Sequence, residues 1–225
     1  MIQNLRNIYK DAEVAILGSG PSVKLYEEKE DIALAVNGAA FLDKKYDIFV
    51  AGDKKAPFRD WWLSSDNKSN SVIRIVSSYI APFDPFLYPD EDYRNFIQKD
   101  YREFVKFNEY VNFVPNFDPT PQHIFFKFGG FGIGFVNKIS PKQTFLYWGG
   151  TISAIALQIS LILGSKNVHL YGCDINNYSG SNYFYDAGDQ KGFLDHGQKE
   201  IMQSTIDKIR DLRVCVNVHG NSFVH

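Results

Sequence analysis

The feature that most constrains the fold is a short apolar run that ends abruptly in a glycine turn. Val14 to Leu17 leads into Gly18-Ser19-Gly20-Pro21-Ser22, and a helix-compatible segment follows from Val23 to Lys29. This order is the opening of a nucleotide-binding α/β unit, in which backbone N–H groups and a helix N-terminus approach a phosphate. Pro21 suits a first helical position and Ser22 a cap. A tight strand-to-helix turn without a ligand has the same pattern.

Several common catalytic and phosphate-binding motifs do not fit the chain. Val23 occupies the third glycine position of Gly-x-Gly-x-x-Gly, so a dinucleotide cofactor is not indicated, and no Gly-Lys-Ser/Thr follows, which excludes a P-loop kinase. The sequence also lacks a Gly-x-Ser-x-Gly nucleophile elbow and a strict Asp-x-Asp motif. Dinucleotide enzymes, P-loop kinases and serine hydrolases are therefore disfavoured.

Polar residues follow the next two apolar runs. Ile32 to Asn37 and Tyr46 to Ala51 are continuous apolar stretches, which indicate buried strands of a parallel sheet. Asn37 ends the first run and Asp53 lies just beyond the second. Ligands bind beyond the carboxyl ends of such strands, so we expect Ser19, Asn37 and Asp53 to converge on one site. Taken singly, Asn37 also suits a helix cap and Asp53 a turn.

The middle of the chain is rich in aromatic residues and less regular. Ser71 to Val76 is expected to form a strand and Asp90 to Tyr110 a helix. Val111 to Ile139 contains several Pro and Gly residues and is predicted to be a long loop. Its Gly-Phe alternation from Gly129 to Gly134 is interpreted as packing or a hinge. We expect one domain over residues 1–225, with an irregular insertion at about 54–145.

Regular structure is predicted again from Gly149. Gly149-Gly150-Thr151 precede a helix, Ile152 to Leu163, that is apolar almost all round and therefore buried, and Gly164 ends it. The elements expected after it are a strand (Asn167 to Asp174), a Tyr-rich lid (about 175–195), a helix (His196 to Leu212) and a strand (Arg213 to Val218). The predicted fold class is α/β: a Rossmann-like, mostly parallel sheet with helices on both faces and a lid insertion.

Charge and cysteine usage limit the classes of partner. The net charge of −2 argues against nucleic acid as a partner. No apolar run has the length of a membrane span, and residues 1–10 lack a signal-peptide core, so we expect a cytoplasmic protein. Cys173 and Cys215 are expected to be buried thiols. The histidines (123, 169, 219 and 225) have no metal-ligand spacing, and His169 is expected to be buried within its strand.

Four blocks carry a resemblance to a known family. They are Ile16 to Ser22 with Asn37, Gly150-Thr151 before the buried helix, Leu170 to Asp174 through Ser181 to Asp186, and His196 at a helix start; Asn221-Ser222 adds to them. Together they resemble the bacterial lipooligosaccharide sialyltransferases, glycosyltransferase family 42, whose fold is a GT-A-like variant. The resemblance covers both ends of the chain, and residues 54–145 do not contribute to it.

The resemblance implies a metal-independent enzyme with a CMP-linked nonulosonic acid as donor and a glycan hydroxyl as acceptor. Ser19 stands where the family has an asparagine near the phosphate, Asn37 matches an asparagine that contacts the nucleotide, and Gly150-Thr151 match a Gly-Ser backbone contact. Tyr183 matches a lid tyrosine that hydrogen-bonds the leaving phosphate, and His196 matches the general base. The implied donor-binding set also includes Gly20, Pro21, Ser22 and Asp174.

Two positions depart from the family pattern and bear on the identity of the donor. Asp53 replaces an asparagine that contacts the donor, and Asn176 stands where a second phosphate-binding tyrosine is expected. Tyr178 or Tyr185 is the candidate substitute for that tyrosine. The chemistry itself suits these residue types, because transfer to a hydroxyl needs a base near neutral pKa and neutral donors at the departing phosphate.

Two further hypotheses remain open. The Gly-Ser-Gly-Pro-Ser opening, Asp53 and Gly149-Gly150-Thr151 also resemble the 6-hydroxymethylpterin diphosphokinase-like family, in which Asp53 and Asp174 would hold Mg²⁺ on a nucleotide triphosphate. The third hypothesis is a non-catalytic relative that binds a nucleotide sugar. Under the transferase hypothesis no cofactor is needed, the pathway is cell-surface lipopolysaccharide biosynthesis, and a lipid-linked acceptor would bring the protein to the inner face of the membrane. An oligomer is compatible with the sequence.

Overall fold

The computed structural model describes residues 2–52, 56, 59–64, 73–77, 123–126, 128–173 and 196–220. Within them, seven strands form one sheet in the order β5-β4-β3-β2-β1-β8-β9, and β6 and β7 form a separate pair. All paired strands run parallel. The strands are β1 (Glu13–Leu17), β2 (Ile32–Val36), β3 (Ile48–Ala51), β4 (Ile73–Ser77), β5 (His123–Phe126), β6 (Phe128–Phe131), β7 (Leu146–Trp148), β8 (Asn167–Tyr171) and β9 (Cys215–Val218).

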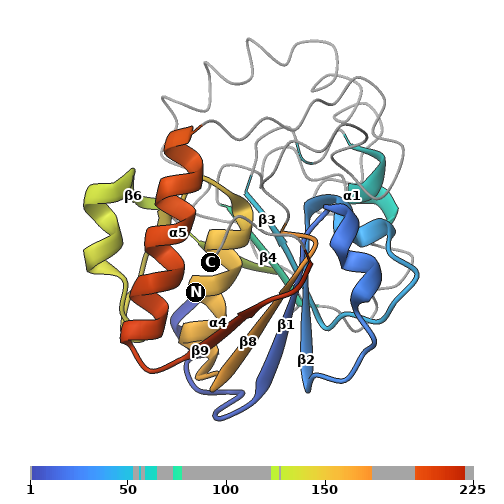
Figure 1. Cartoon of the computed structure of the whole chain (residues 1–225), viewed down its shortest axis with the longest axis horizontal. Helices are drawn as coiled ribbons and strands as arrows, with labels where there is room; N and C mark the ends of the chain where they lie inside the picture. Colours follow the sequence, from blue (N-terminus) through green and yellow to red (C-terminus); the bar gives the residue numbers. More distant parts are fainter. Residues whose placement is uncertain are drawn as a thin grey trace.

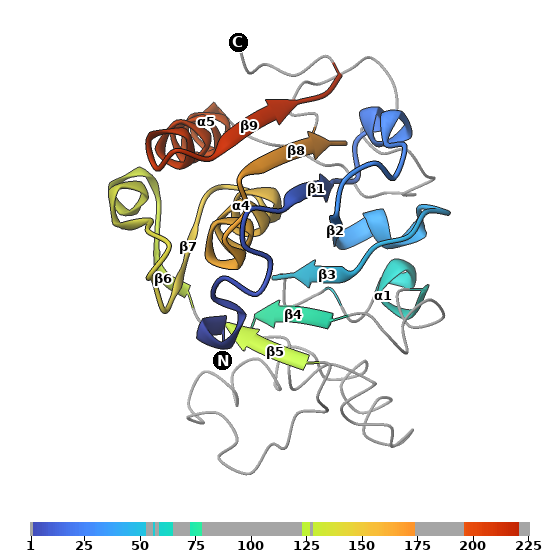
Figure 2. The same cartoon turned by 90° about the horizontal axis from the view of Figure 1, so that it is seen from below.

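Helices cover both faces of the sheet, which confirms the predicted α/β class with a mostly parallel sheet. The predicted lid at about 175–195 lies outside the described residues. The α-helices are α1 (Asp60–Ser64), α4 (Ile152–Leu163) and α5 (His196–Asp211); the 3-10 helices are η1 (Ile2–Leu5), η2 (Pro21–Leu25), η3 (Asn37–Phe41) and η6 (Ile133–Lys138). Figure 1 shows the strands with their helices, and Figure 2 shows α4 and α5 on one face and α1 on the other. None of the helices in the described ranges is long and apolar enough to cross a bilayer.

Both faces of the sheet bury apolar side chains. On the face covered by α4, the core contains Val14, Ile16 and Leu34, whereas the opposite face contains Ala15 and Ala33 of the strands together with Trp62. Successive residues of a strand point to opposite faces, so a continuous apolar run is what a sheet covered on both sides requires. This is why the apolar runs predicted the strands well.

The helix α4 forms where the sequence predicts it. The Thr151 side chain caps its first turn by accepting a hydrogen bond from the Ala154 N–H, and Gly164 ends it in the left-handed conformation with φ 87°. All its residues from Ser153 to Leu163 are buried. The helix therefore fills the centre of one layer, and its first turn lies at the carboxyl edge of the sheet because the chain then returns to begin β8.

The structure corrects the predicted loop over Val111 to Ile139. The described part of this segment contains β5, β6 and the 3-10 helix η6. The irregular insertion expected at about 54–145 is also regular in part, because β4 and β5 extend the main sheet. A Cβ on Gly129 would lie 2.8 Å from the Tyr147 ring, and one on Gly130 would overlap the Phe135 ring. The alternating glycines therefore make room for aromatic rings in a strand. The predicted helix at Asp90 to Tyr110 lies outside the described residues.

Several smaller expectations also change. The segment after the first glycine turn is the 3-10 helix η2, with Pro21 as its first residue and Gly20 as its cap, rather than a longer helix from Val23 to Lys29. Asn37 begins η3 instead of ending β2. Of the two cysteines, both with free thiols, Cys173 is buried as expected but Cys215 is exposed on the edge strand β9.

The strand order reverses between β1 and β8. From β1 the chain builds the sheet outward through β2 to β5, and β8 and β9 then extend it on the other side of β1. In open α/β sheets, ligands bind beyond the carboxyl ends of the strands at such a reversal. The loops after Leu17 and Tyr171 are therefore the expected position of a site.

Candidate functional site

Backbone hydrogen bonds join the loops that follow β1 and β8. The Gly18 N–H donates to the Tyr171 carbonyl at 2.7 Å, and the Gly20 N–H donates to the Gly172 carbonyl at 2.7 Å. In return, the Gly172 N–H donates to the Ser22 hydroxyl at 2.8 Å. The glycine turn is thus fixed to β8 by three hydrogen bonds.

The two facing glycines explain why this turn needs residues without side chains. A Cβ on Gly18 would overlap the Gly172 carbonyl, and a Cβ on Gly172 would lie 2.7 Å from the Val23 Cβ; Gly172 also has φ 65°. The Gly18 and Gly20 N–H groups are both bonded to the end of β8 and the residue after it, so they are not free to bind a phosphate. The Ser19 N–H lies between them and makes no hydrogen bond within the described residues. It is therefore the amide of this turn that a ligand can use.

Ser19 and Asn37 lie at neighbouring strand ends. The Ser19 hydroxyl donates to the Val36 carbonyl at 3.5 Å, directly before Asn37. Asn37 adopts a left-handed conformation with φ 49°, which asparagine tolerates better than most residues. Its Oδ1 is buried, and within the described ranges it has no hydrogen-bond partner. A buried, unpaired amide oxygen is unfavourable, which makes Asn37 a candidate for a ligand contact.

The first turns of α4 and α5 are packed together at the same edge. Gly150 has φ 79°, and a Cβ there would lie 2.7 Å from the Gln198 carbonyl of α5. The Thr151 hydroxyl lies 3.6 Å from the Met202 sulfur. Since α5 begins at His196, this contact places the first turn of α5 beside Gly150. The His196 side chain is outside the described part of the structure.

A continuous set of contacts connects these groups across the sheet edge. The thiol of Cys173, which follows Gly172, donates to the Ser153 hydroxyl in the first turn of α4 at 3.5 Å. A Cβ on Gly52, at the end of β3, would lie 2.6 Å from the Ile152 side chain. The ends of β3 and β8 thus meet the start of α4. Of the predicted site residues, the positions of Asp53, Asp174, Asn176, Tyr178, Tyr183 and Tyr185 lie outside the described residues.

A polar cluster behind the glycine turn was not predicted from the sequence. The Tyr171 hydroxyl donates to Glu30 Oε1 at 2.7 Å, the His219 ring stacks on Tyr171 at 4.2 Å, and His169 Nδ1 lies 2.9 Å from His219 Nε2. The Glu30 side chain is only 4% exposed. His169 and Tyr171 belong to β8, but Glu30 and His219 are distant from them in sequence, so only the sheet order brings the cluster together. His169 thus has a partner, but it is not fully buried.

Burial shifts the acid–base properties of this cluster. It raises the pKa of Tyr26, which packs against Tyr171, to about 12, with Glu30 adding to the effect. Burial and then the neighbouring His169 lower the pKa of His219, while Glu30 acts in the opposite direction. In the described ranges, no group of three His, Cys, Asp or Glu residues is arranged to hold a metal ion.

No family model matches the chain, and no curated protein matches it significantly. Solved structures do match. The Campylobacter jejuni sialyltransferase CstII in complex with cytidine-5'-monophosphate aligns with a TM-score of 0.52 and 15% identity, covering 95% of this chain and 82% of that one.

A second structure of CstII, in complex with CMP-3FNeuAc, aligns with a TM-score of 0.50 and 15% identity, covering 94% of this chain and 83% of that one. At this identity the likeness concerns the fold. It agrees with the GT-A-like variant that the sequence motifs led us to expect. The chain therefore has the α/β fold of the CstII sialyltransferase.

Proposed function

We propose that this protein is a glycosyltransferase that uses a CMP-sugar donor. The observation that carries the proposal is that Ser19, Asn37, Thr151 and the backbone of His196, which match separate motifs of one transferase family, all lie at the carboxyl edge of one sheet. The fold is shared with CstII, whose structures contain CMP and CMP-3FNeuAc.

The donor would be held by groups that the fold leaves available. The Ser19 N–H and the buried Asn37 amide are the candidates for the nucleotide, and the Gly150-Thr151 backbone is the third contact. Neutral amides and hydroxyls bind a phosphate without a cation, so we propose that transfer is independent of metal. The proposed donor sugar is a sialic-acid-like nonulosonic acid and the acceptor a cell-surface glycan. A lipid-linked acceptor would place the protein at the inner face of the membrane.

The proposed chemistry uses a base and a hydrogen-bond donor. His196 would take the proton of the acceptor hydroxyl, while the oxygen of that hydroxyl attacks the anomeric carbon of the donor sugar. The bond from that carbon to the CMP phosphate breaks, and Tyr183 would donate a hydrogen bond to the departing phosphate oxygen. The diphosphokinase-like alternative rests on Asp53 and Asp174, and neither it nor a non-catalytic role is favoured by a contact in the described residues.

The test is calorimetric titration with CMP, a CMP-sugar and ATP, each with Mg²⁺ and with EDTA. We expect the cytidine ligands to bind equally in both conditions and ATP not to bind. Asn37→Gly keeps the left-handed backbone and removes the amide, so it should weaken CMP about tenfold. Asn7→Gly is the matched control, because Asn7 also has a positive φ, 58°, but contacts the far end of α4. ATP binding that needs Mg²⁺ would overturn the proposal.

A further inference from the structure

A surface made by η6 and the segment that connects it to β7 combines exposed apolar and basic side chains. Ile133 is 55% exposed and Phe145 46% exposed, although both are large and apolar. The side chains that the inference uses, here called the η6–β7 surface, are Ile133, Asn137, Lys138, Lys142, Thr144 and Phe145, all exposed. Exposed apolar side chains that gather on one surface usually mark an interaction site.

This part of the chain carries no negative charge. Residues 119–173 contain no Asp or Glu, although the whole chain has 26 acidic and 24 basic residues. Arg6 adds a further cation, because its guanidinium donates to the Lys142 carbonyl at 3.0 Å. The neighbouring helix α5, by contrast, carries Lys, Arg, Asp and Glu together. The η6–β7 surface therefore favours a partner that is anionic.

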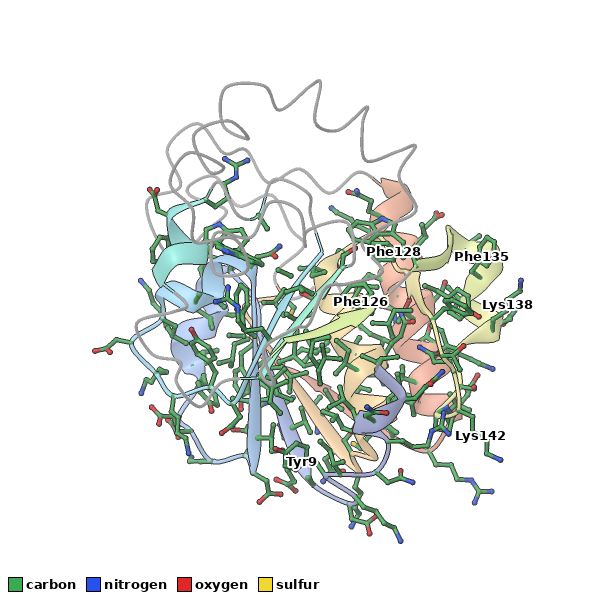
Figure 3. All side chains as sticks on the ribbon, turned by 180° about the vertical axis from the view of Figure 1, so that it is seen from behind. Tyr9, Phe126, Phe128, Phe135, Lys138 and Lys142 are labelled. Atoms are coloured by element: carbon green, nitrogen blue, oxygen red, sulfur yellow. The ribbon has the colours of Figure 1, made fainter. Side chains whose placement is uncertain are left out.

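The local structure holds these side chains outward. Lys138 Nζ lies 4.6 Å above the Phe135 ring, and that ring stacks on Tyr147 at 5.9 Å. A Cβ on Gly132 or Gly134 would meet nothing within 4 Å, so these two positions face open space. Val136 and Ile139, by contrast, are buried in the core and anchor the segment. Figure 3 shows Phe135, Lys138 and Lys142 along one edge of the molecule.

We propose that the η6–β7 surface docks on an anionic lipid bilayer. Apolar side chains next to lysines suit the interface of such a membrane, where the rings and aliphatic groups enter the headgroup region and the ammonium groups meet lipid phosphates. Nucleic acid would use the cations but leaves no role for the exposed Ile133. The proposal does not depend on the reaction that the protein catalyses.

The test is co-sedimentation of the full chain with vesicles of phosphatidylcholine, with and without phosphatidylglycerol. We expect binding to the anionic vesicles that weakens with salt. Ile133→Ser and Phe145→Ser should each weaken it roughly tenfold, and Lys138→Ala and Lys142→Ala about fivefold each. Leu25→Ser is the matched control, because Leu25 is also 55% exposed but lies on the opposite face of the sheet, and Lys24→Ala is its basic counterpart. Both controls should bind like the wild type.

Three results would overturn the proposal. The first is no binding to anionic vesicles, or equal binding by all variants. The second is a change of oligomeric state in Ile133→Ser or Phe145→Ser, measured by analytical ultracentrifugation, which would assign the surface to a second copy of the chain. The third is an RNA that binds through Lys138 and Lys142 while vesicle binding is unaffected by both lysine variants.

Discussion

Gly18 and Gly172 show how single residues set the shape of the candidate site. Their backbones touch where β1 meets β8, so that a side chain on either would force the two strands apart. We expect Gly18→Ala to lower the free energy of unfolding by about 1–3 kcal/mol, the usual cost of overpacking a tight interior contact. Urea denaturation followed by circular dichroism measures it. Gly134→Ala is the control, because a Cβ there meets nothing, and it should not destabilise the protein. Equal loss in both variants would contradict the packing argument.

His219 gives a prediction on pH. Its pKa is lowered by burial and by His169, below the usual value of 6.5. As pH falls below about 6.5, the unfolded chain takes up a proton at His219 that the folded chain does not, so the folded state loses stability. Stability should therefore be fully retained above that pH and decline below it. We expect His219→Gln to be less stable near pH 7.5, because it loses the stacked cluster, but to depend less steeply on pH between about 7.5 and 5.5.

Chemical denaturation at several pH values checks this difference in slope. Tyr171→Phe serves as a comparison within the same cluster, since it removes the hydroxyl bonded to Glu30 but leaves both histidines. It should be less stable at every pH while keeping the slope of the wild type. If His219→Gln follows the same pH dependence as the wild type, His219 is not the titrating group.

At the scale of elements, one buried side chain attaches β7 to α4. The Gln158 side chain accepts a hydrogen bond from the Tyr147 N–H at 2.8 Å and donates one to the Tyr147 carbonyl at 2.7 Å. The Gln143 amide donates to Gln158 Oε1 at 3.0 Å. Gln158→Leu would leave those backbone groups buried without partners, so we expect a loss of about 2–4 kcal/mol in unfolding free energy. Gln203→Leu on α5 is the matched control, since Gln203 makes one exposed bond to Asp207, and its effect should be below about 0.5 kcal/mol. A control as unstable as Gln158→Leu would argue against this role.

The element most poorly predicted was β6, for a reason visible in its neighbours. Glycine is usually unfavourable in a strand, so the Gly-Phe alternation predicted a loop. In the structure, Gly129 makes room for Tyr147 and Phe145, and Gly130 for Phe135. The stability of this strand comes from ring packing across the β6–β7 pair, which no local propensity contains.

At the scale of the whole molecule, the start of α5 brings His196 to the carboxyl edge of the sheet, where the donor is proposed to bind. The backbone there is set by the contact of Gln198 with Gly150, so the proposed base is positioned by packing between helices. His196→Ala should lower kcat by about 10²–10⁴, the usual effect of losing a general base, with little change in the donor Kd. Tyr183→Phe should slow donor hydrolysis as well as transfer. Transfer and donor binding are measured for both; a His196→Ala enzyme within a few-fold of wild type would remove His196 from the mechanism.

The sequence by itself determined the buried strands, the central helix and its limits, because continuous apolar runs and terminal capping residues are local signals. It also pointed to Ser19, Asn37 and Gly150-Thr151 as residues of one edge, since parallel strands all end on the same side. Only the tertiary structure decided that the Gly18 and Gly20 amides bond to β8 and that β6 is a strand. It alone also decided that Glu30, Tyr171, His169 and His219 form one cluster. Each of these depends on which strands become neighbours, and strand order results from the burial of the whole chain and not from any segment of it.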